Sequence, residues 1–265
     1  NKFGMTSPEV MLVAQHLYEG IDTEKEGHIA LVTYIRTDSV RVSAEAQERA
    51  RGYIAEKYGK EYVPAKPNFY KSKKDAQDAH ECIRPIDITR TPESMKGVLD
   101  KKHYNVYKII YERFIASQMS EAIYNSVQIK IDNSGYTFKV SGKTLQFAGF
   151  TAVYQDAAPK QDPTKKDDDE AETGKLLPDL KEGEEVDLVR LLPEQKFTKP
   201  PLRYTDASLV KAMEDKGIGR PSTYASIISV LSRRKYVTKD GKYMVPTEVA
   251  YQITDLLMKY FTDIM

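Results

Sequence analysis

The sequence predicts an α+β protein of two or three domains, and three observations support this class. At 265 residues, the chain is longer than a typical single domain. Helical patterns dominate as far as Met119, whereas residues alternate as in antiparallel strands from near Tyr124. Two short helices with a hairpin are then expected after Thr205. The pattern therefore changes twice along the chain, as it does where one domain gives way to another.

Two helices are expected in the first part of the chain, on either side of a strand. Ser7 can cap the first helix, Pro8 occupies its first position and Gly20 ends it. The stretch LVTYIRTDSVRVS, residues 31–43, alternates as a strand does and passes into a second helix after Ser43. This stretch carries most of the chemistry that the sequence suggests.

The middle of the chain is expected to be mainly β structure. A third helix is predicted from His103 to Met119, and strands then alternate about turns at 133–135 and 141–142. This pattern is typical of an antiparallel meander, to which 186–190 would add a strand. Residues 156–175 are charged and almost free of apolar side chains, so we expect a solvated loop or linker there.

The last part reads as two helices across a tight turn, followed by a hairpin. Thr205 or Asp206 begins the first helix, the GIGRP turn ends it, and the second helix runs from about Ser222 to Arg234. A hairpin turn at 239–241 and a closing helix follow. This order resembles a helix-turn-helix with a wing.

Composition excludes several classes of protein. The formal net charge is only +1, so any binding of nucleic acid must come from local basic grooves. A single cysteine, Cys82, excludes an intrachain disulfide framework and a cysteine-based zinc cluster. No apolar run approaches the roughly 20 residues that span a bilayer. The chain begins with Asn1, not Met, as if cut from a longer polypeptide, and cytoplasmic residence is expected.

Tyr34 is the first candidate for catalysis. On a strand, Tyr34, Arg36 and Asp38 would share one face. The pKa of a phenol is near 10, so a tyrosine nucleophile needs help in losing its proton. The planar guanidinium of Arg36 can bind two phosphate oxygens at once, which suits phosphoryl transfer through a phosphotyrosine. The alternative is a half-exposed strand whose tyrosine packs and whose charges are solvated.

A second candidate site is DAQDAHECIRP, residues 75–85. On a helix, Gln77, His80, Glu81 and Arg84 would lie on neighbouring positions of one side. A histidine can shuttle a proton or bind a phosphate near neutral pH. The alternative is a capped surface turn with an internal ion pair.

Two further stretches carry polar residues with a plausible role in binding. Arg220, Ser222 and Thr223 lie where a helix begins, so they can form an anion site or simply cap that helix. Gln15 and Glu19, with Tyr18, are near the end of the first helix and can face whatever Tyr34 faces. The alternative there is an ordinary polar helix face.

Three motifs in order resemble the type IA DNA topoisomerases, specifically the bacterial topoisomerase I branch. They are LVTYIRTDS, AQDAHECIRP and YTDASLVKAMEDKGIGRPSTYASIISVL, and the likeness covers nearly the whole chain, being weakest in 156–195. The resemblance implies a helical tyrosine-bearing domain over 1–120 and an antiparallel β arch or hinge over 121–200. Residues 201–265 would then be part of a winged-helix-like domain that binds single-stranded DNA.

The resemblance also implies roles for individual residues. Tyr34 would attack a phosphodiester of single-stranded DNA, giving a 5′-phosphotyrosyl enzyme and a free 3′-hydroxyl. Arg36 would hold the scissile phosphate, and His80 would form hydrogen bonds near the active site and the DNA backbone. The positions expected to contact or support the bound strand are Gln15, Glu19, Thr33, Asp38, Ser39, Glu81, Arg84, Arg220, Ser222 and Thr223.

The implied activity is ATP-independent relaxation of negatively supercoiled DNA by transient single-strand cleavage. In this family Mg²⁺ is bound by an N-terminal Toprim domain that is not in this sequence, so we expect no metal site and no ATP site here. The expected partners are single-stranded and negatively supercoiled DNA and the Toprim domain, with a monomeric protein associated with the bacterial nucleoid. As a fragment, the chain should not relax plasmids alone.

Two alternatives stay open at this point. The chain can be a non-catalytic single-stranded-DNA-binding module that keeps the topoisomerase fold, or the topoisomerase part of a reverse gyrase. Cys82 and Ile86 replace the Ala and Thr expected in the second motif. Cys82 therefore places a thiol near the expected site, where oxidation or alkylation would reach it.

Overall fold

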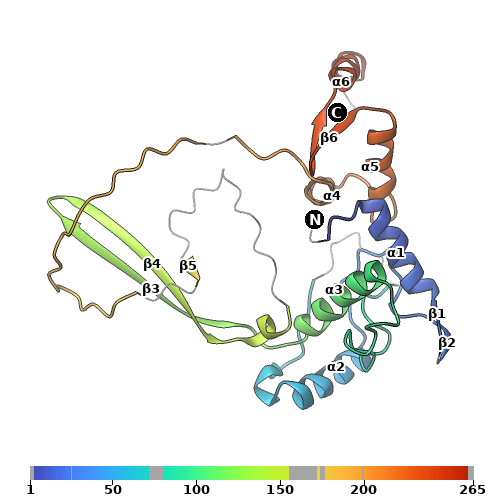
Figure 1. The fold of residues 1–265 in the computed structure, drawn as a ribbon, viewed down its shortest axis with the longest axis horizontal. Coiled ribbons are helices and arrows are strands. Elements are labelled where there is room, and N and C mark those ends of the chain that lie inside the picture. The colour runs from blue at the N-terminus through green and yellow to red at the C-terminus, as the bar shows by residue number, and fades with distance from the viewer. Residues whose placement is uncertain are drawn as a thin grey trace. The chain divides into compact units, whose positions relative to one another are not determined.

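The structure is a computed structural model that describes residues 3–24, 26–71, 80–154, 172–173, 177–198 and 200–261. The chain divides into two compact units, of which the first combines Asn1–Gln118 with Arg203–Met265 and the second is Met119–Leu202. Helices and small antiparallel sheets together confirm the predicted α+β class (Figure 1). No helix in the described ranges is long and apolar enough to cross a membrane.

The first helix shows how local sequence sets an element's start. Its N-cap is Thr6, not the predicted Ser7, because Thr6 has an extended backbone and its side chain accepts a hydrogen bond from the amide of Glu9. The carboxylate of Glu9 in turn accepts a hydrogen bond from the amide of Thr6, which completes a capping box. Gly20 ends the helix as predicted, with φ of +125°. The buried side chains of α1 (Ser7–Glu19) are Val13, Ala14 and Leu17.

The other elements of the N-terminal part form around two longer helices. Ser43 caps the second helix as predicted, and Asp100 caps the third. The third helix buries Tyr107 and Ile115 completely. The elements between residues 20 and 118 are β1 (Ile21–Thr23), β2 (Gly27–Ile29), α2 (Ala44–Lys57), the 3₁₀ turn η1 (Lys60–Tyr62) and α3 (Lys101–Ser117).

Helices α1 and α3 are joined by polar side chains as well as by apolar packing. Nζ of Lys102 lies 2.9 Å from Oε1 of Glu9. Nδ1 of His16 lies 3.2 Å from Nε2 of His103, whose Nδ1 is 2.6 Å from Oδ2 of Asp100. These contacts hold α1 against α3, and the β1–β2 hairpin connects the end of α1 to the Tyr34 segment.

The C-terminal part has the predicted order of two helices, a hairpin and a closing helix. Its small core consists of Met213, Ile228 and Met244, with Leu209 and Val237 packed against them. The elements are α4 (Asp206–Asp215), α5 (Tyr224–Arg233), β6 (Val237–Asp240), β7 (Tyr243–Pro246) and α6 (Glu248–Tyr260).

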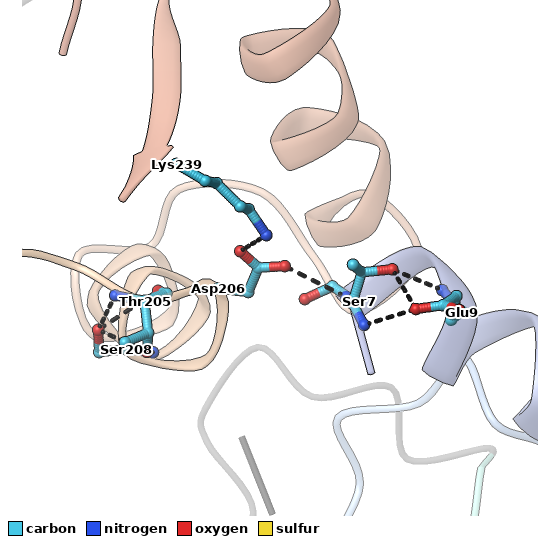
Figure 2. Close-up of polar contacts among 7 residues, drawn as sticks. Ser7, Glu9, Thr205, Asp206, Ser208 and Lys239 are labelled. Carbon is cyan, nitrogen blue, oxygen red and sulfur yellow. Dashed lines mark hydrogen bonds and ion pairs between the residues drawn. The ribbon is translucent and has the colours of Figure 1, made fainter. Parts of the chain in front are cut away.

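One carboxylate connects this C-terminal part to α1 within the first unit. Figure 2 shows Asp206 between Ser7 and Lys239. Its Oδ2 accepts a hydrogen bond of 3.4 Å from the amide of Ser7, and its Oδ1 lies 2.8 Å from Nζ of Lys239. The side chain of Asp206 is only 13% exposed. Because it lies at the start of both α1 and α4, the charge also meets the positive ends of two helix dipoles.

The second unit is built on one long hairpin. Strands β3 (Ile123–Asn133) and β4 (Tyr136–Phe147) pair antiparallel, with Asn133 opposite Tyr136 (Figure 1). The predicted turn at 141–142 is wrong, because β3 is long enough to pair with β4 through Gly142, which faces Val127. The short strand β5 (Glu172–Thr173) adds parallel to β4, and the 3₁₀ turn η2 (Gly149–Ala152) follows β4.

Two other expectations fall between residues 156 and 198. The strand predicted at 186–190 is wrong, because these residues are exposed and pair with no strand in the described part of the chain. Most of the predicted charged loop at 156–175 lies outside the described residues.

Candidate active site

The segment that carries Tyr34 is not a strand, contrary to prediction. Its amide and carbonyl groups bond to two separate partners instead of to one neighbouring strand. The amide of Leu31 donates to the carbonyl of Leu17 at the end of α1, at 2.8 Å. The amide of Thr33 donates to the carbonyl of Arg84, at 2.9 Å. Only an isolated bridge, between Val32 and Pro85, has the geometry of a ladder.

The alternation of exposure that suggested a strand nevertheless holds around Tyr34. Ile35 is 3% exposed and packs inward, whereas Tyr34 and Arg36 are both exposed. The phenol and the guanidinium two residues away therefore both reach the solvent. Asp38 is half-buried, and Ser39 is buried with its hydroxyl oxygen 3.2 Å from the amide of Arg41.

Residues 80–85 form an irregular loop and not the helix on which a shared side for His80, Glu81 and Arg84 was considered. Cys82 donates its amide to the carbonyl of Arg41, and Arg84 donates its amide to Oγ1 of Thr33. These bonds run to another segment, which a helix would not allow. Residues 75–79 of the motif, including Gln77, lie outside the described residues.

Thr33 and Arg84 hold this loop against the Tyr34 segment. Oγ1 of Thr33 donates to the carbonyl of Cys82 at 2.7 Å and accepts from the amide of Arg84 at 2.9 Å. Nη2 of Arg84 lies 2.8 Å from Oε2 of Glu81, and the two side chains are 16% and 26% exposed. The internal ion pair that the sequence offered as an alternative is therefore present.

Helix α3 fixes the continuation of this loop. The hydroxyl of Tyr107 donates to the carbonyl of Arg90 at 2.6 Å, and that of Tyr111 donates to the carbonyl of Ile88 at 2.7 Å. Burial raises the pKa of both phenols far above the ordinary value. Both hydroxyls therefore keep their protons and serve as structural donors.

Tyr34 lies between two other rings. The centroid of the His80 ring is 5.0 Å from that of Tyr34, with 47° between the planes. Tyr18 approaches from α1 at 5.4 Å and 72°, an edge-to-face arrangement. Tyr34 is nevertheless 37% exposed. The fold thus brings together Tyr34 and His80, which were predicted as catalytic, and Tyr18, which was expected to face the same side.

The end of α1 places its polar side chains around the same place. Nε2 of Gln15 donates to Oε1 of Glu19, so these two predicted DNA contacts act on each other, at 2.5 Å. The carbonyl of Glu19 lies 3.1 Å from Nε2 of His28. A hydrogen bond with Asp22, together with this carbonyl, raises the pKa of His28. Nothing in the sequence indicated that the backbone carbonyls of residues 17 and 19 would accept these hydrogen bonds, since every residue has a backbone carbonyl.

The predicted anion site in the C-terminal part is a tight turn before α5. Gly217 and Gly219 have positive φ, of +69° and +76°. Oγ1 of Thr223 accepts from the amide of Arg220 at 2.9 Å, whereas the side chains of Arg220 and Ser222 are exposed. Thr223 rather than Ser222 is the N-cap of α5. The role of this turn in binding DNA stays a prediction.

Cys82 does not behave as the sequence suggested. Burial raises the pKa of its thiol to about 11, although the charge of Arg84 acts in the opposite direction. Very little thiolate is present near neutral pH. The expectation that oxidation or alkylation would exploit this cysteine is therefore not supported.

Comparisons with known proteins place this geometry in one family. Residues 1–265 match the sequence model of a DNA topoisomerase family. "DNA topoisomerase 1" of Xylella fastidiosa is 44% identical over 264 residues, which are 99% of this chain and 32% of that protein. The solved structure of full-length topoisomerase I from Thermotoga maritima has a TM-score of 0.81 and 39% identity, over 99% of this chain and 40% of that one. The chain thus spans less than half the length of either relative.

Proposed function

Because the chain belongs to the bacterial type IA DNA topoisomerases, we propose that it supplies the DNA-cleaving tyrosine of such an enzyme. The observation that carries the proposal is the placement of Tyr34. Its phenol is exposed, its ring lies beside His80, and its backbone is held by α1 and by the loop that ends at Arg84. A nucleophile needs this combination of access and fixed direction.

The proposed reaction is a transesterification on single-stranded DNA. Oη of Tyr34 loses its proton and forms a bond to the phosphorus, while the bond from phosphorus to the 3′ oxygen breaks. The 3′ oxygen takes up a proton, so the products are a 5′-phosphotyrosyl link and a 3′-hydroxyl. Religation reverses these steps after strand passage. One phosphoester replaces another, so no ATP is required, and supercoiling drives the relaxation.

Arg36 and His80 have distinct proposed roles. The guanidinium of Arg36, two residues from Tyr34, is exposed and can hold two oxygens of the scissile phosphate. His80 contacts the ring of Tyr34, from where it can donate a hydrogen bond to the DNA backbone. Together they would stabilise the charge that develops on the phosphate during attack.

The proposed DNA contacts divide into two groups. Gln15, Glu19 and Asp38 are candidates for direct contact near Tyr34, and Arg220, Ser222 and Thr223 for contact farther along the strand. Thr33, Ser39, Glu81 and Arg84 are buried or half-buried and bond to the segments around Tyr34 and His80, so we propose that they support the site and do not touch DNA.

We propose that Mg²⁺ is bound outside the described residues. No group of three or more His, Cys, Asp or Glu side chains there could hold a metal ion. The residues therefore do not fit Mg²⁺, and every step above is assigned to protein side chains. Binding of Mg²⁺ by a Toprim domain stays a proposal, as do the monomeric state and the location at the bacterial nucleoid.

Covalent trapping tests the assignment of the nucleophile. A polypeptide that extends these residues to the full length of the relatives is incubated with Mg²⁺ and a labelled single-stranded oligonucleotide, and the adduct is mapped. We expect the label on Tyr34 and no adduct in Tyr34→Phe. Tyr136→Phe, which removes a hydroxyl that is also exposed, should react normally. Covalent DNA that persists in Tyr34→Phe would refute the assignment.

The same assay separates the proposed enzyme from a non-catalytic binding module. A binding module would retain the oligonucleotide without forming an adduct in any variant. The 265-residue chain alone is expected to bind single strands weakly and to leave supercoiled plasmids unchanged. Relaxation of plasmids by this chain alone would contradict that expectation.

A further inference from the structure

The direction of the Tyr34 ring depends on its neighbours, since its segment has no regular secondary structure. The backbone is fixed by bonds at residues 31, 33 and 86, but these leave the side chain free to rotate about its own bonds. Two rings restrict that rotation, Tyr18 at 5.4 Å and His80 at 5.0 Å. Two rings therefore contact the Tyr34 side chain although the residue is 37% exposed.

Tyr18 is itself held firmly. It occupies the last turn of α1, next to Leu17, which is completely buried. The carbonyl of Leu17 accepts hydrogen bonds from the amides of both Leu31 and Val32, at 2.8 and 3.3 Å. The backbone of α1 next to Tyr18 is thus tied to residues 31 and 32, shortly before Tyr34.

His28 anchors the C-terminal end of α1, one residue beyond Tyr18. Its imidazole bonds to the carbonyl of Glu19 and to the carboxylate of Asp22, at 3.1 and 2.8 Å. The ring lies where a side chain on Gly20 would be, since a Cβ there would come within 2.4 Å of Nε2 of His28. Glycine at position 20, which also has positive φ, allows this close approach.

We propose that Tyr18 is a positioning residue for the nucleophile, which orients the Tyr34 phenol by edge-to-face contact. This inference rests on the proposed function of Tyr34. The contact restricts the orientations open to the Tyr34 ring, which is 37% exposed. Ring pairs of this kind change the population of one orientation by about two- to tenfold. Because the effect acts on orientation, it should change the rate of attack and not the affinity for DNA.

Two substitutions separate orientation from simple packing. Tyr18→Phe keeps the ring and should preserve the position of Tyr34. Tyr18→Leu keeps apolar contact at this half-buried site but removes the ring face and edge. Tyr53→Leu is the matched control, because Tyr53 is also half-buried on a helix and also pairs edge-to-face, with Tyr111 at 6.4 Å.

The first measurement uses the 265-residue chain and the NMR signal of Tyr34. Tyrosine is labelled with ¹³C in the ring, and the Tyr34 signal among the 18 tyrosines is identified by its loss in Tyr34→Phe. In Tyr18→Leu the signal should move towards the shift of free tyrosine. It should stay in place in Tyr18→Phe and Tyr53→Leu. A signal that does not move in Tyr18→Leu would overturn the proposal.

The second measurement is the rate of adduct formation at saturating oligonucleotide, in the polypeptide of full relative length. Tyr18→Leu should react about two- to tenfold more slowly with an unchanged Kd for DNA, and Tyr18→Phe should react normally. An unchanged rate in Tyr18→Leu, or a rate lowered equally by Tyr53→Leu, would contradict the proposal. If the parent protein forms no adduct on Tyr34, the proposed function fails, and the NMR result still decides whether Tyr18 fixes the ring.

Discussion

The Tyr34 segment lacks regular secondary structure but is well buried, whereas the β3–β4 hairpin is regular but largely exposed. The Tyr34 segment has no helix or strand, yet Leu31 and Val32 are 1% and 0% exposed. The hairpin has a continuous ladder from 124 to 145, yet most of its side chains are exposed. Regular secondary structure therefore does not show which region of this protein is more stable against local unfolding. Burial and hydrogen bonds to distant segments show it.

The largest expected effect comes from the same substitution made in both regions. Leu31→Ala removes a buried side chain and should lower the free energy of unfolding by about 2–5 kcal/mol. Leu145→Ala, in β4, removes a side chain that is 51% exposed and should cost about 1 kcal/mol or less. Native-state hydrogen exchange measures the two units separately. Equal losses of unfolding free energy in the two variants would contradict the difference between the two regions.

Chemical labelling of thiols compares access and reactivity in the two regions. The pKa of Cys82 is raised to about 11 by burial, so its thiolate is scarce at pH 8. A cysteine placed at the exposed hairpin turn, by Ser134→Cys with Cys82→Ser, should react with iodoacetamide about a hundredfold faster. Labelling of the unfolded proteins, which should proceed at similar rates, is the control. Rapid labelling of Cys82 in the folded chain would show that its loop opens readily.

A smaller effect is expected from removing one hydroxyl in each region. Thr33→Val leaves the amide of Arg84 and the carbonyl of Cys82 without the hydroxyl that bonds to both. This should cost about 1–3 kcal/mol in the free energy of unfolding. Thr137→Val removes an exposed bond to Asp132 and should cost about 0.5 kcal/mol or less. Urea denaturation measures both, and a larger loss in the hairpin variant would reverse the comparison.

The smallest effect is expected at an exposed polar contact of α1. A hydrogen bond from the Thr6 backbone, followed by contact with Lys102, lowers the pKa of Glu9 to about 2. Because the folded pKa lies below the unfolded value, Glu9 stabilises the fold above about pH 4.3 and loses this contribution as the pH falls towards 2. The difference in thermal midpoint between the parent and Glu9→Gln should shrink over that range.

Lys102 provides the control for this pH dependence. Without its ammonium group, the pKa of Glu9 in the folded state should be less strongly lowered. In a Lys102→Gln background, the difference caused by Glu9→Gln should therefore vanish at a higher pH. A difference that does not depend on pH would show that Glu9 acts through something other than its charge.

Local signals made most helices predictable from the sequence. A cap such as Ser43 and a periodic apolar stripe are contained within one helix, so their meaning does not depend on the rest of the fold. The Tyr34 segment could not be predicted in this way, because its hydrogen-bond partners are the carbonyls of Leu17 and Arg84. Alternation of exposure alone does not distinguish a strand from a segment whose backbone bonds to several separate parts of the chain.

The candidate site, like the fold, was only partly predictable from the sequence. Resemblance to a family singled out Tyr34 and His80, and the fold brings their rings into contact. Tyr18 was expected only to face the same side as Tyr34, because spacing along a helix gives a direction and not a contact. The inward roles of Thr33 and Ser39 had no signal, since a hydroxyl that bonds DNA and one that bonds a backbone are the same residue type in the sequence.

The contact between Ser7 and Asp206 also bears on the order of folding. These residues are 199 positions apart, so the second unit is an insertion within the first. During synthesis, the whole of 119–202 must leave the ribosome before α4 can reach α1. The first unit therefore closes last, through contacts of high sequence separation, which are slow to form. Until then, the amide of Ser7 at the start of α1 lacks its hydrogen bond to the carboxylate of Asp206.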